Sequence, residues 1–175
     1  DKKSTKEVSR SHKIDISPSG LISVLGGKWT TYRKIAEDAI DAAISINKLK
    51  KKKCRTEKTK LFGYKKNIDW SDHMHVYGSL KKKVESVGGK EDNKSLSSKF
   101  YISNNIIKWS IIHEMALNLE DVLARRTRCV FLDANESKRI APAVAKKMAE
   151  ILEKDQVWID TELKNFNKLI ENYTV

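Results

Sequence analysis

The sequence contains few of the residues that mark several common protein classes. Only two of its 175 residues are cysteines, Cys54 and Cys129, and neither belongs to a CxxC pair. This excludes a disulfide scaffold and fits a reducing compartment. Proline is equally rare, and no apolar run approaches the roughly 20 residues of a membrane-spanning helix. The first residues include neither Met nor an apolar signal core, so we expect a piece of a longer protein.

Acidic residues are also in the minority. Lys and Arg number 35 against 23 Asp and Glu, which gives a formal net charge of +12. The excess is concentrated at 48–60 and at Lys81–Lys83, which permits a basic helical module that binds nucleic acid or an anionic membrane surface. Because 48–60 holds no aromatic residue and a single Arg, unlike most nucleic-acid sites, we favour a solvated linker there.

The N-terminal part is predicted to be a β-hairpin followed by a helix. Apolar residues at 8–16 and 21–25 indicate two short strands, and Ser17-Pro18-Ser19-Gly20 indicates the turn between them. A helix from 30 to 47 follows from the helical spacing of its apolar residues. Residues 48–66 are predicted to be a linker with a short extended piece around Leu61-Phe62.

The rest of the chain is predicted to be helical. We expect a short helix at 74–80, a mobile loop at 86–99, and helices at 106–117, 119–127, 135–153 and 156–172. Asn118 and Asp155 suit helix N-caps, with Asp121 completing a capping box. Pro142 predicts that its helix begins near residue 141 or is kinked. The expected fold is mainly α, an orthogonal helical bundle preceded by the hairpin and helix.

One predicted turn combines the features of an anion site. Gly26-Gly27-Lys28 stands between the strand at 21–25 and the helix from residue 30. Glycines let the backbone approach a ligand closely, and a helix start favours negative charge. With Lys28 adding a positive charge, the turn indicates an anion, or an atom that becomes anionic during a reaction. The alternative is an ordinary turn, and the P-loop pattern GxxxxGK[ST] is absent.

The remaining reactive side chains indicate structure rather than chemistry. His73, His75 and His113 lack further ligands at suitable spacing, so no metal site is predicted. Cys129 is interpreted as a small core residue rather than a nucleophile. Arg125-Arg126-Thr127-Arg128 ends a predicted helix, where cations offset the helix dipole. Binding of a phosphate or a carboxylate by these arginines is the alternative.

Two longer blocks resemble one family. Residues 19–38, SGLISVLGGKWTTYRKIAED, closely resemble a signature of FAD-dependent glycerol-3-phosphate dehydrogenases. Residues 113–128, HEMALNLEDVLARRTR, resemble the hallmark of that family's C-terminal domain, and residues 131–134 and 141–150 continue it in register. The resemblance implies that 1–47 is the last hairpin and helix of an α/β FAD-binding domain. It makes 48–66 a basic linker and 67–175 the helical C-terminal domain.

The resemblance also implies a function for the full-length protein. The family oxidises sn-glycerol 3-phosphate to dihydroxyacetone phosphate and passes electrons through FAD to quinone. The resemblance implies peripheral attachment to the mitochondrial inner membrane or, alternatively, to the bacterial cytoplasmic membrane. It implies no nucleic-acid partner and is compatible with a homodimer. Since GxGxxG is absent, FAD is expected to be bound mainly by a part that this chain lacks, and the chain alone is expected to be inactive.

Site residues follow from the same resemblance. Arg10 and Lys28 are expected to be catalytic, because they resemble the family's substrate-site arginine and lysine, and a guanidinium suits a phosphate or an oxyanion. The Gly26-Gly27-Lys28 turn resembles the one that meets the flavin, where a helix start stabilises the anionic reduced form. The expected cofactor-binding residues are Leu25, Gly26, Gly27, Lys28, Thr30 and Thr31.

Overall fold

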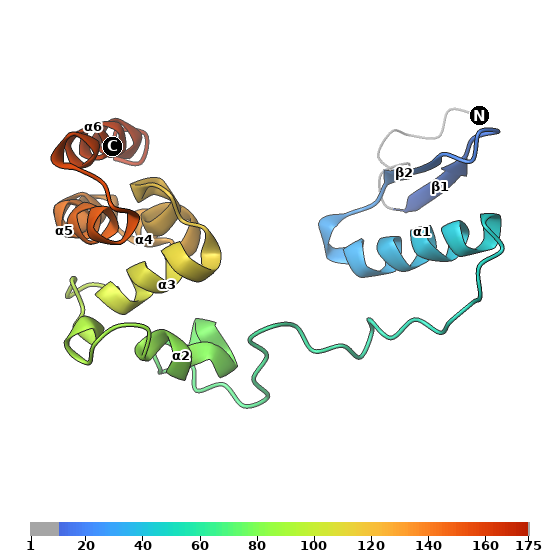
Figure 1. The fold of residues 1–175 in the computed structure, drawn as a ribbon, viewed down its shortest axis with the longest axis horizontal. Helices are drawn as coiled ribbons and strands as arrows, with labels where there is room; N and C mark the ends of the chain where they lie inside the picture. Colours follow the sequence, from blue (N-terminus) through green and yellow to red (C-terminus); the bar gives the residue numbers. More distant parts are fainter. Residues whose placement is uncertain (1–10, 175) are drawn as a thin grey trace. The chain divides into compact units, whose positions relative to one another are not determined.

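The computed structural model describes residues 11–174, which divide into two compact units with a boundary between Leu61 and Phe62 (Figure 1). The first unit contains β1 (His12–Ile16), β2 (Ile22–Gly26), the 3-10 helix η1 (Trp29–Thr31) and α1 (Tyr32–Ile46). Residues 47–74 form turns, bends and irregular segments without a helix or strand, so the extended piece predicted around Leu61-Phe62 is not a strand, and Phe62 lies in a turn. The part of the predicted first strand that precedes residue 11 lies outside the described residues.

The second unit is helical. It contains η2 (His75–Leu80), α2 (Lys81–Glu85), η3 (Glu91–Asn93), α3 (Asn104–Glu114), the π-helical segment η4 (Asp121–Arg126), α4 (Cys129–Leu132), α5 (Ala134–Leu152) and α6 (Gln156–Ile170). The expectation of a mainly α fold with a leading hairpin is confirmed. No helix among residues 11–174 combines the length and the apolar character that crossing a membrane requires.

The hairpin of the first unit forms as its turn residues predict. β1 and β2 pair antiparallel, with His12 opposite Gly26 and Ile16 opposite Ile22. The turn is closed by the Gly20 N–H, which donates to the Ser17 carbonyl at 2.9 Å, and Gly20 takes a φ of 84°. None of the described residues of this unit is buried, because two strands and one helix are too few to enclose a core.

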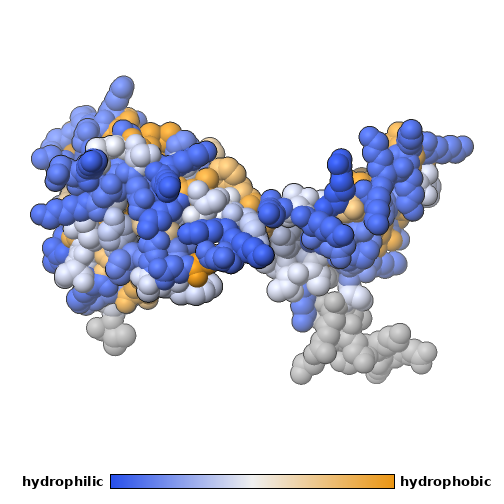
Figure 2. Space-filling view, turned by 90° about the horizontal axis from the view of Figure 1, so that it is seen from below, coloured by the Kyte–Doolittle hydropathy of each residue, from blue (hydrophilic) through white to orange (hydrophobic). Residues whose placement is uncertain are grey.

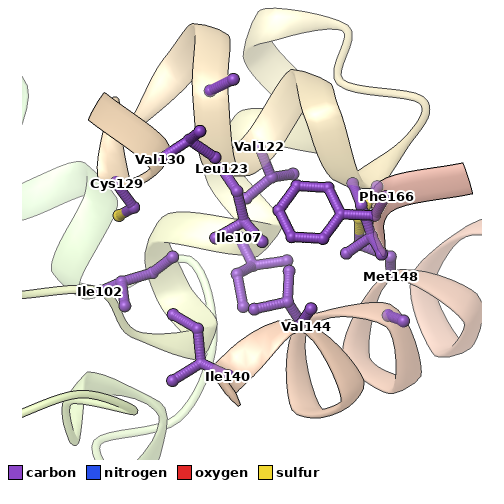
Figure 3. Close-up of a cluster of buried hydrophobic side chains, with 14 of the residues drawn as sticks. Ile102, Ile107, Val122, Leu123, Cys129, Val130, Ile140, Val144, Met148 and Phe166 are labelled. Carbon is purple, nitrogen blue, oxygen red and sulfur yellow. The ribbon is translucent and has the colours of Figure 1, made fainter. Parts of the chain in front are cut away.

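The second unit has a closed hydrophobic core between α3, η4, α4, α5 and α6 (Figure 3). Three apolar residues of α5 are buried in it, namely Ile140, Val144 and Met148. Phe166 of α6 packs against them. Hydrophilic side chains cover most of the surface in the view of Figure 2. The remaining labelled core residues are Ile102, Ile107, Val122, Leu123, Cys129 and Val130.

The ends of the helices around residue 115 differ from the prediction. α3 begins after Ser103, whose hydroxyl accepts from the Ile106 N–H, and it ends at Glu114 because Met115 takes a left-handed φ of 56°. The predicted end at 117 is therefore wrong, and Met115 is exposed. Asn118 does cap the next segment, since its Oδ1 accepts from the Asp121 N–H at 2.8 Å. That segment is π-helical rather than α-helical.

The structure tests one of the two alternatives for Pro142, the position at which its helix begins. α5 runs from Ala134 through Pro142 to Leu152, so the predicted start near 141 is wrong. Asp133 is the N-cap, and its carboxylate accepts from the Glu136 N–H at 2.8 Å. Pro142 and Lys138 both lie on the exposed face. Water can therefore reach the Lys138 carbonyl that a proline nitrogen leaves without a donor.

The structure of segments 74–80 and 86–99 also differs in detail from the prediction. η2 is a 3-10 helix interrupted at Gly78, and α2 continues it over the Lys81–Lys83 cluster. Residues 86–99 are irregular apart from η3. They are nevertheless tied to their neighbours, because the Asn93 side chain donates to the Glu85 carbonyl at 2.9 Å and the Tyr101 hydroxyl donates to the Asn93 carbonyl at 2.7 Å.

A buried carboxylate joins this loop to α5. Glu136 accepts from the Ser97 hydroxyl at 2.5 Å and from Arg139 at 2.7 and 2.8 Å. The hydrogen bonds from Arg139 and then from Ser97 lower the pKa of Glu136 to about 2. Since its pKa is lower in the folded state than in the unfolded chain, its contribution to stability is complete above the unfolded pKa. The contribution is lost as the pH falls through the folded pKa.

Replacement of Glu136 by Gln is therefore expected to lower the Tm at pH 7 by several degrees and to flatten the acid limb of the stability curve. Thermal unfolding of the 175-residue chain between neutral pH and the pKa near 2 measures both effects. The control is Glu150→Gln, because Glu150 only pairs with Lys147 on the surface. An acid limb in the Glu136 variant as steep as that of the unaltered chain would contradict this role.

Candidate functional site

The Gly26-Gly27-Lys28 turn connects β2 to η1 at the edge of the first unit. Gly26 and Gly27 have φ angles of 73° and 85°, a region that side-chain-bearing residues rarely adopt. A Cβ on Gly27 would lie 2.7 Å from Ile35 Cδ1 and 3.3 Å from His12 Cβ. The absence of a side chain therefore lets α1 and β1 close around the turn.

Backbone bonds from Thr31 hold Lys28 at the start of the helix. The Thr31 N–H and hydroxyl both donate to the Lys28 carbonyl at 2.9 Å. The Lys28 ammonium is exposed and forms no ion pair with residues 11–174. Since the first N–H groups of a helix have no acceptor within it, the turn places the Lys28 ammonium beside a helix start, where negative charge is favoured.

A shallow apolar hollow lies beside this turn. It is bordered by Trp29 and Tyr32, whose rings stack at 5.7 Å, and its floor includes Ala36 and Ala39 of α1. The two alanines are three residues apart, so they lie on the same face of the helix and leave room over it. The hollow and the cation at its end suit a flat, largely apolar ligand with a negatively charged edge. Sequence reasoning missed this lining, although the alanine spacing carries a signal for it.

A hydrogen bond between His12 and Asp38 clamps the hairpin to α1 next to the turn. His12 Nε2 lies 2.9 Å from Asp38 Oδ2, and Lys34 Nζ lies 2.8 Å from Asp38 Oδ1. The hydrogen bond from Lys34, with that from His12, holds the pKa of Asp38 below its usual value. Because His12 is paired with Gly26 across the hairpin, the clamp fixes the position of the turn. The pair is 26 residues apart, and no local pattern in the sequence indicates it.

The structure brings most of the predicted site residues into this turn. The six residues expected to bind the cofactor lie along the end of β2 and through η1. Leu25 is exposed, and the Thr31 hydroxyl is used within the turn, which leaves the Thr30 hydroxyl for a ligand. Arg10 lies outside the described residues. The roles assigned to these residues remain predictions. The predicted cofactor-binding residues are Leu25, Gly26, Gly27, Lys28, Thr30 and Thr31.

The three arginines at 125–128 separate into two kinds. Arg125 pairs with Glu120 at 2.6 Å and with Asp121 at 2.7 Å. Arg126 donates from Nε and Nη2 to the Glu114 carbonyl at 2.9 and 2.6 Å, which caps the end of α3. The structural interpretation is confirmed for these two arginines. Arg128 is exposed and forms no ion pair within the described part of the chain.

Cys129 and the histidines of the second unit pack against neighbouring side chains. Cys129 is buried in the core, as predicted, and burial raises the pKa of its thiol. The ring of His73 stacks on Tyr101 at 5.7 Å, and the ring of His75 lies 5.3 Å from Trp70. Between residues 11 and 174, no three His, Cys, Asp or Glu side chains are grouped closely enough to hold a metal ion.

Comparisons with known proteins identify relatives along the whole chain. Residues 22–157 match the family model for the C-terminal domain of alpha-glycerophosphate oxidase. The mitochondrial glycerol-3-phosphate dehydrogenase of Mesocricetus auratus is 31% identical over 95% of this chain and 26% of its own length. The corresponding protein of Bos taurus is 32% identical over 95% of the chain, and that of Arabidopsis thaliana is 29% identical over 98%.

The chain spans 26% of the two mammalian relatives and 32% of the plant relative. The family match crosses the boundary between the two units, from the start of β2 to the first turn of α6. It includes the Gly26-Gly27-Lys28 turn and the arginine cluster alike. The match and these relatives show that the chain belongs to the glycerophosphate oxidase C-terminal domain family, which is shared with the glycerol-3-phosphate dehydrogenases.

Proposed function

We propose that this chain is part of an FAD-dependent enzyme that oxidises sn-glycerol 3-phosphate to dihydroxyacetone phosphate and passes the electrons to quinone. The observation that carries the proposal is the Gly26-Gly27-Lys28 turn, which lies inside the region that matches the family. The names of the relatives support the substrate, since they are glycerol-3-phosphate dehydrogenases. FAD and quinone follow from the family resemblance of the sequence blocks.

The residues of the first unit fit a flavin edge. The absence of a Cβ at Gly27 lets α1 and β1 pack closely at the turn, and the hollow beside it is apolar and bordered by two stacked rings. Lys28 supplies a positive charge at the same end. A flat ring system whose edge carries negative charge matches this arrangement in shape and in electrostatics.

FAD, when bound, supplies the electron acceptor for this oxidation. The part played by the chain is electrostatic. The exposed Lys28 ammonium holds a negatively charged oxygen of the substrate or of the cofactor edge, and the His12–Asp38 clamp keeps the turn in place. We assign Arg10 to the substrate by family resemblance, as a guanidinium that faces a phosphate or an oxyanion.

The exposed apolar side chains of the first unit support a division into domains. Leu25, Trp29 and Ile40 are all more than half exposed, which is costly for an isolated hairpin and helix. We assign 1–47 to the end of the FAD-binding domain, 48–66 to a basic linker and 67–175 to the helical C-terminal domain. On this assignment the chain alone lacks most of the FAD site and does not turn over.

The names of the relatives support a proposal for the location of the full-length protein. Their names place them in mitochondria, and we propose peripheral attachment of this protein to the mitochondrial inner membrane, with the bacterial cytoplasmic membrane as the alternative. A homodimer is part of the same proposal. The alternative function is a basic helical module for nucleic acid or anionic lipid, which depends on the exposed lysines at 50–53.

One experiment separates these functions. We expect the purified full-length protein to show a flavin absorbance spectrum that bleaches on addition of sn-glycerol 3-phosphate and recovers on addition of a short-chain quinone. Replacement of the lysines at 50–53 by Gln should leave this turnover intact. A protein without flavin, whose binding to nucleic acid or anionic vesicles weakens steeply with salt and requires these lysines, would establish the alternative instead.

A further inference from the structure

A second candidate site lies wholly within the second unit and shares no residue with the Lys28 turn. A groove is lined by residues from 70–77, 99–101 and 126–132, together with Ile106. We call it the ring groove, because aromatic and imidazole rings form much of its wall. The comparisons and the proposed reaction assign nothing to it.

The rings occur in two pairs. His73 stacks on Tyr101 with an angle of 15° between the rings, and Trp70 lies beside His75 at an angle of 52°. Trp70 is 77% exposed. An indole left open at the edge of a groove offers a flat apolar face on which a planar ring can stack.

The cations of the groove are not equivalent. Lys99 is paired with Asp133, and two of the guanidinium nitrogens of Arg126 are used on the Glu114 carbonyl. The one carboxylate in the lining, that of Asp72, is neutralised by Lys81 at 2.7 Å. Arg128 is left with a full positive charge that no residue in 11–174 pairs.

The backbone at Arg128 is also unusual. Its φ is 60°, in the left-handed region, and it stands at the N-cap of α4. A residue other than glycine is uncommon in this conformation and carries backbone strain there, and Lys48, Met115 and Glu153 share it. Glycine would relieve the strain, but it would remove the guanidinium from the groove.

We infer that the ring groove binds a small phosphate ester that carries a planar ring, of the nucleoside monophosphate class. The guanidinium fork of Arg128 suits the phosphate, and the Trp70 face suits the ring. A nucleic-acid strand fits less well, because the groove offers one unpaired arginine rather than a row of cations. Glycerol 3-phosphate lacks the ring that the aromatic wall would recognise.

The test uses isothermal titration of the 175-residue chain with adenosine 5′-monophosphate, inorganic phosphate and adenosine as separate probes. We expect the nucleotide to bind more tightly than either of its parts. Arg128→Gly should weaken nucleotide binding at least ~10-fold, since it removes a charge-assisted contact, while the Tm stays the same or rises as the left-handed strain is relieved. Trp70→Ala should weaken it at least ~5-fold through lost stacking.

Lys138→Gln is the matched control, because it removes one exposed positive charge from α5 outside the groove. It should leave binding unchanged. The inference is overturned if the nucleotide does not bind at millimolar concentration, or if Arg128→Gly binds it as well as the unaltered chain does. It is also overturned if inorganic phosphate binds as tightly as the nucleotide, or if the Lys138 control loses as much affinity as the Arg128 variant. None of these outcomes depends on flavin content or turnover.

Discussion

Replacement of Lys28 by Ala in the full-length enzyme is expected to lower turnover with sn-glycerol 3-phosphate by about 10²–10³-fold, because it removes one preorganised charge at a reacting centre. The structure indicates that stability will change little. The Lys28 side chain is exposed and forms no ion pair within residues 11–174, and the hydrogen bonds that hold the turn are accepted by its backbone carbonyl from Thr31. Steady-state kinetics together with the flavin absorbance per protein measure the two effects separately.

Two controls make this result specific. Lys50→Ala removes an exposed lysine from the segment that follows α1 and should leave turnover unchanged. Lys28→Arg retains the charge with a different geometry, and it should recover part of the activity if the charge is what matters. Normal turnover of Lys28→Ala at full flavin content would exclude the catalytic role of Lys28. The ring-groove experiment would be unaffected.

Replacement of Gly78 by Ala is expected to destabilise the second unit by about 3 kcal/mol or more, because it combines backbone strain with a steric clash. Gly78 has φ and ψ angles of 52° and −118°, which a residue with a side chain rarely adopts. A Cβ there would lie 2.1 Å from the Gly63 carbonyl oxygen. That oxygen accepts from the Ser79 N–H at 3.0 Å, so it is held in place.

Urea unfolding of the 175-residue chain, followed by circular dichroism at 222 nm where helices dominate the signal, measures the free energy of unfolding of the helical unit. Gly89→Ala is the matched control, since an added Cβ at Gly89 meets no atom within 4 Å. Its effect should stay within about 0.5 kcal/mol. Equal stability of the two variants would show that the backbone at Gly78 can adopt another conformation at little cost.

Features of the fold that depend on short-range interactions follow from the sequence. The hairpin turn, the start of α6 at Asp155 and the cap at Asn118 depend on contacts within a few residues. For example, the Asp155 carboxylate accepts from the Trp158 N–H at 2.9 Å. Such contacts leave a mark in the local residue pattern, and each of these features was predicted correctly.

The errors occur where a distant residue decides the backbone. α3 ends at Glu114 although no glycine follows, because Met115 is held left-handed while the Ala116 N–H donates to the Ser110 carbonyl and Arg126 caps the Glu114 carbonyl. The serines and glycines of residues 86–99 predict a mobile loop. It is tied down by buried polar contacts such as the one between Ser97 and Glu136.

By itself, the sequence determined that the chain is mainly helical after a leading hairpin, that a Gly-Gly-Lys turn precedes the first helix, and which family it resembles. These properties depend on local turn chemistry, on periodicity and on contiguous motifs. Only the tertiary structure decided that His12 clamps Asp38 beside that turn, that Arg128, unlike Arg125 and Arg126, has no partner for its side chain within residues 11–174, and that Trp70 and Tyr101 line one groove. The physical reason is that these contacts join residues far apart in the chain, whose proximity is set by packing and hydrogen bonding rather than by spacing.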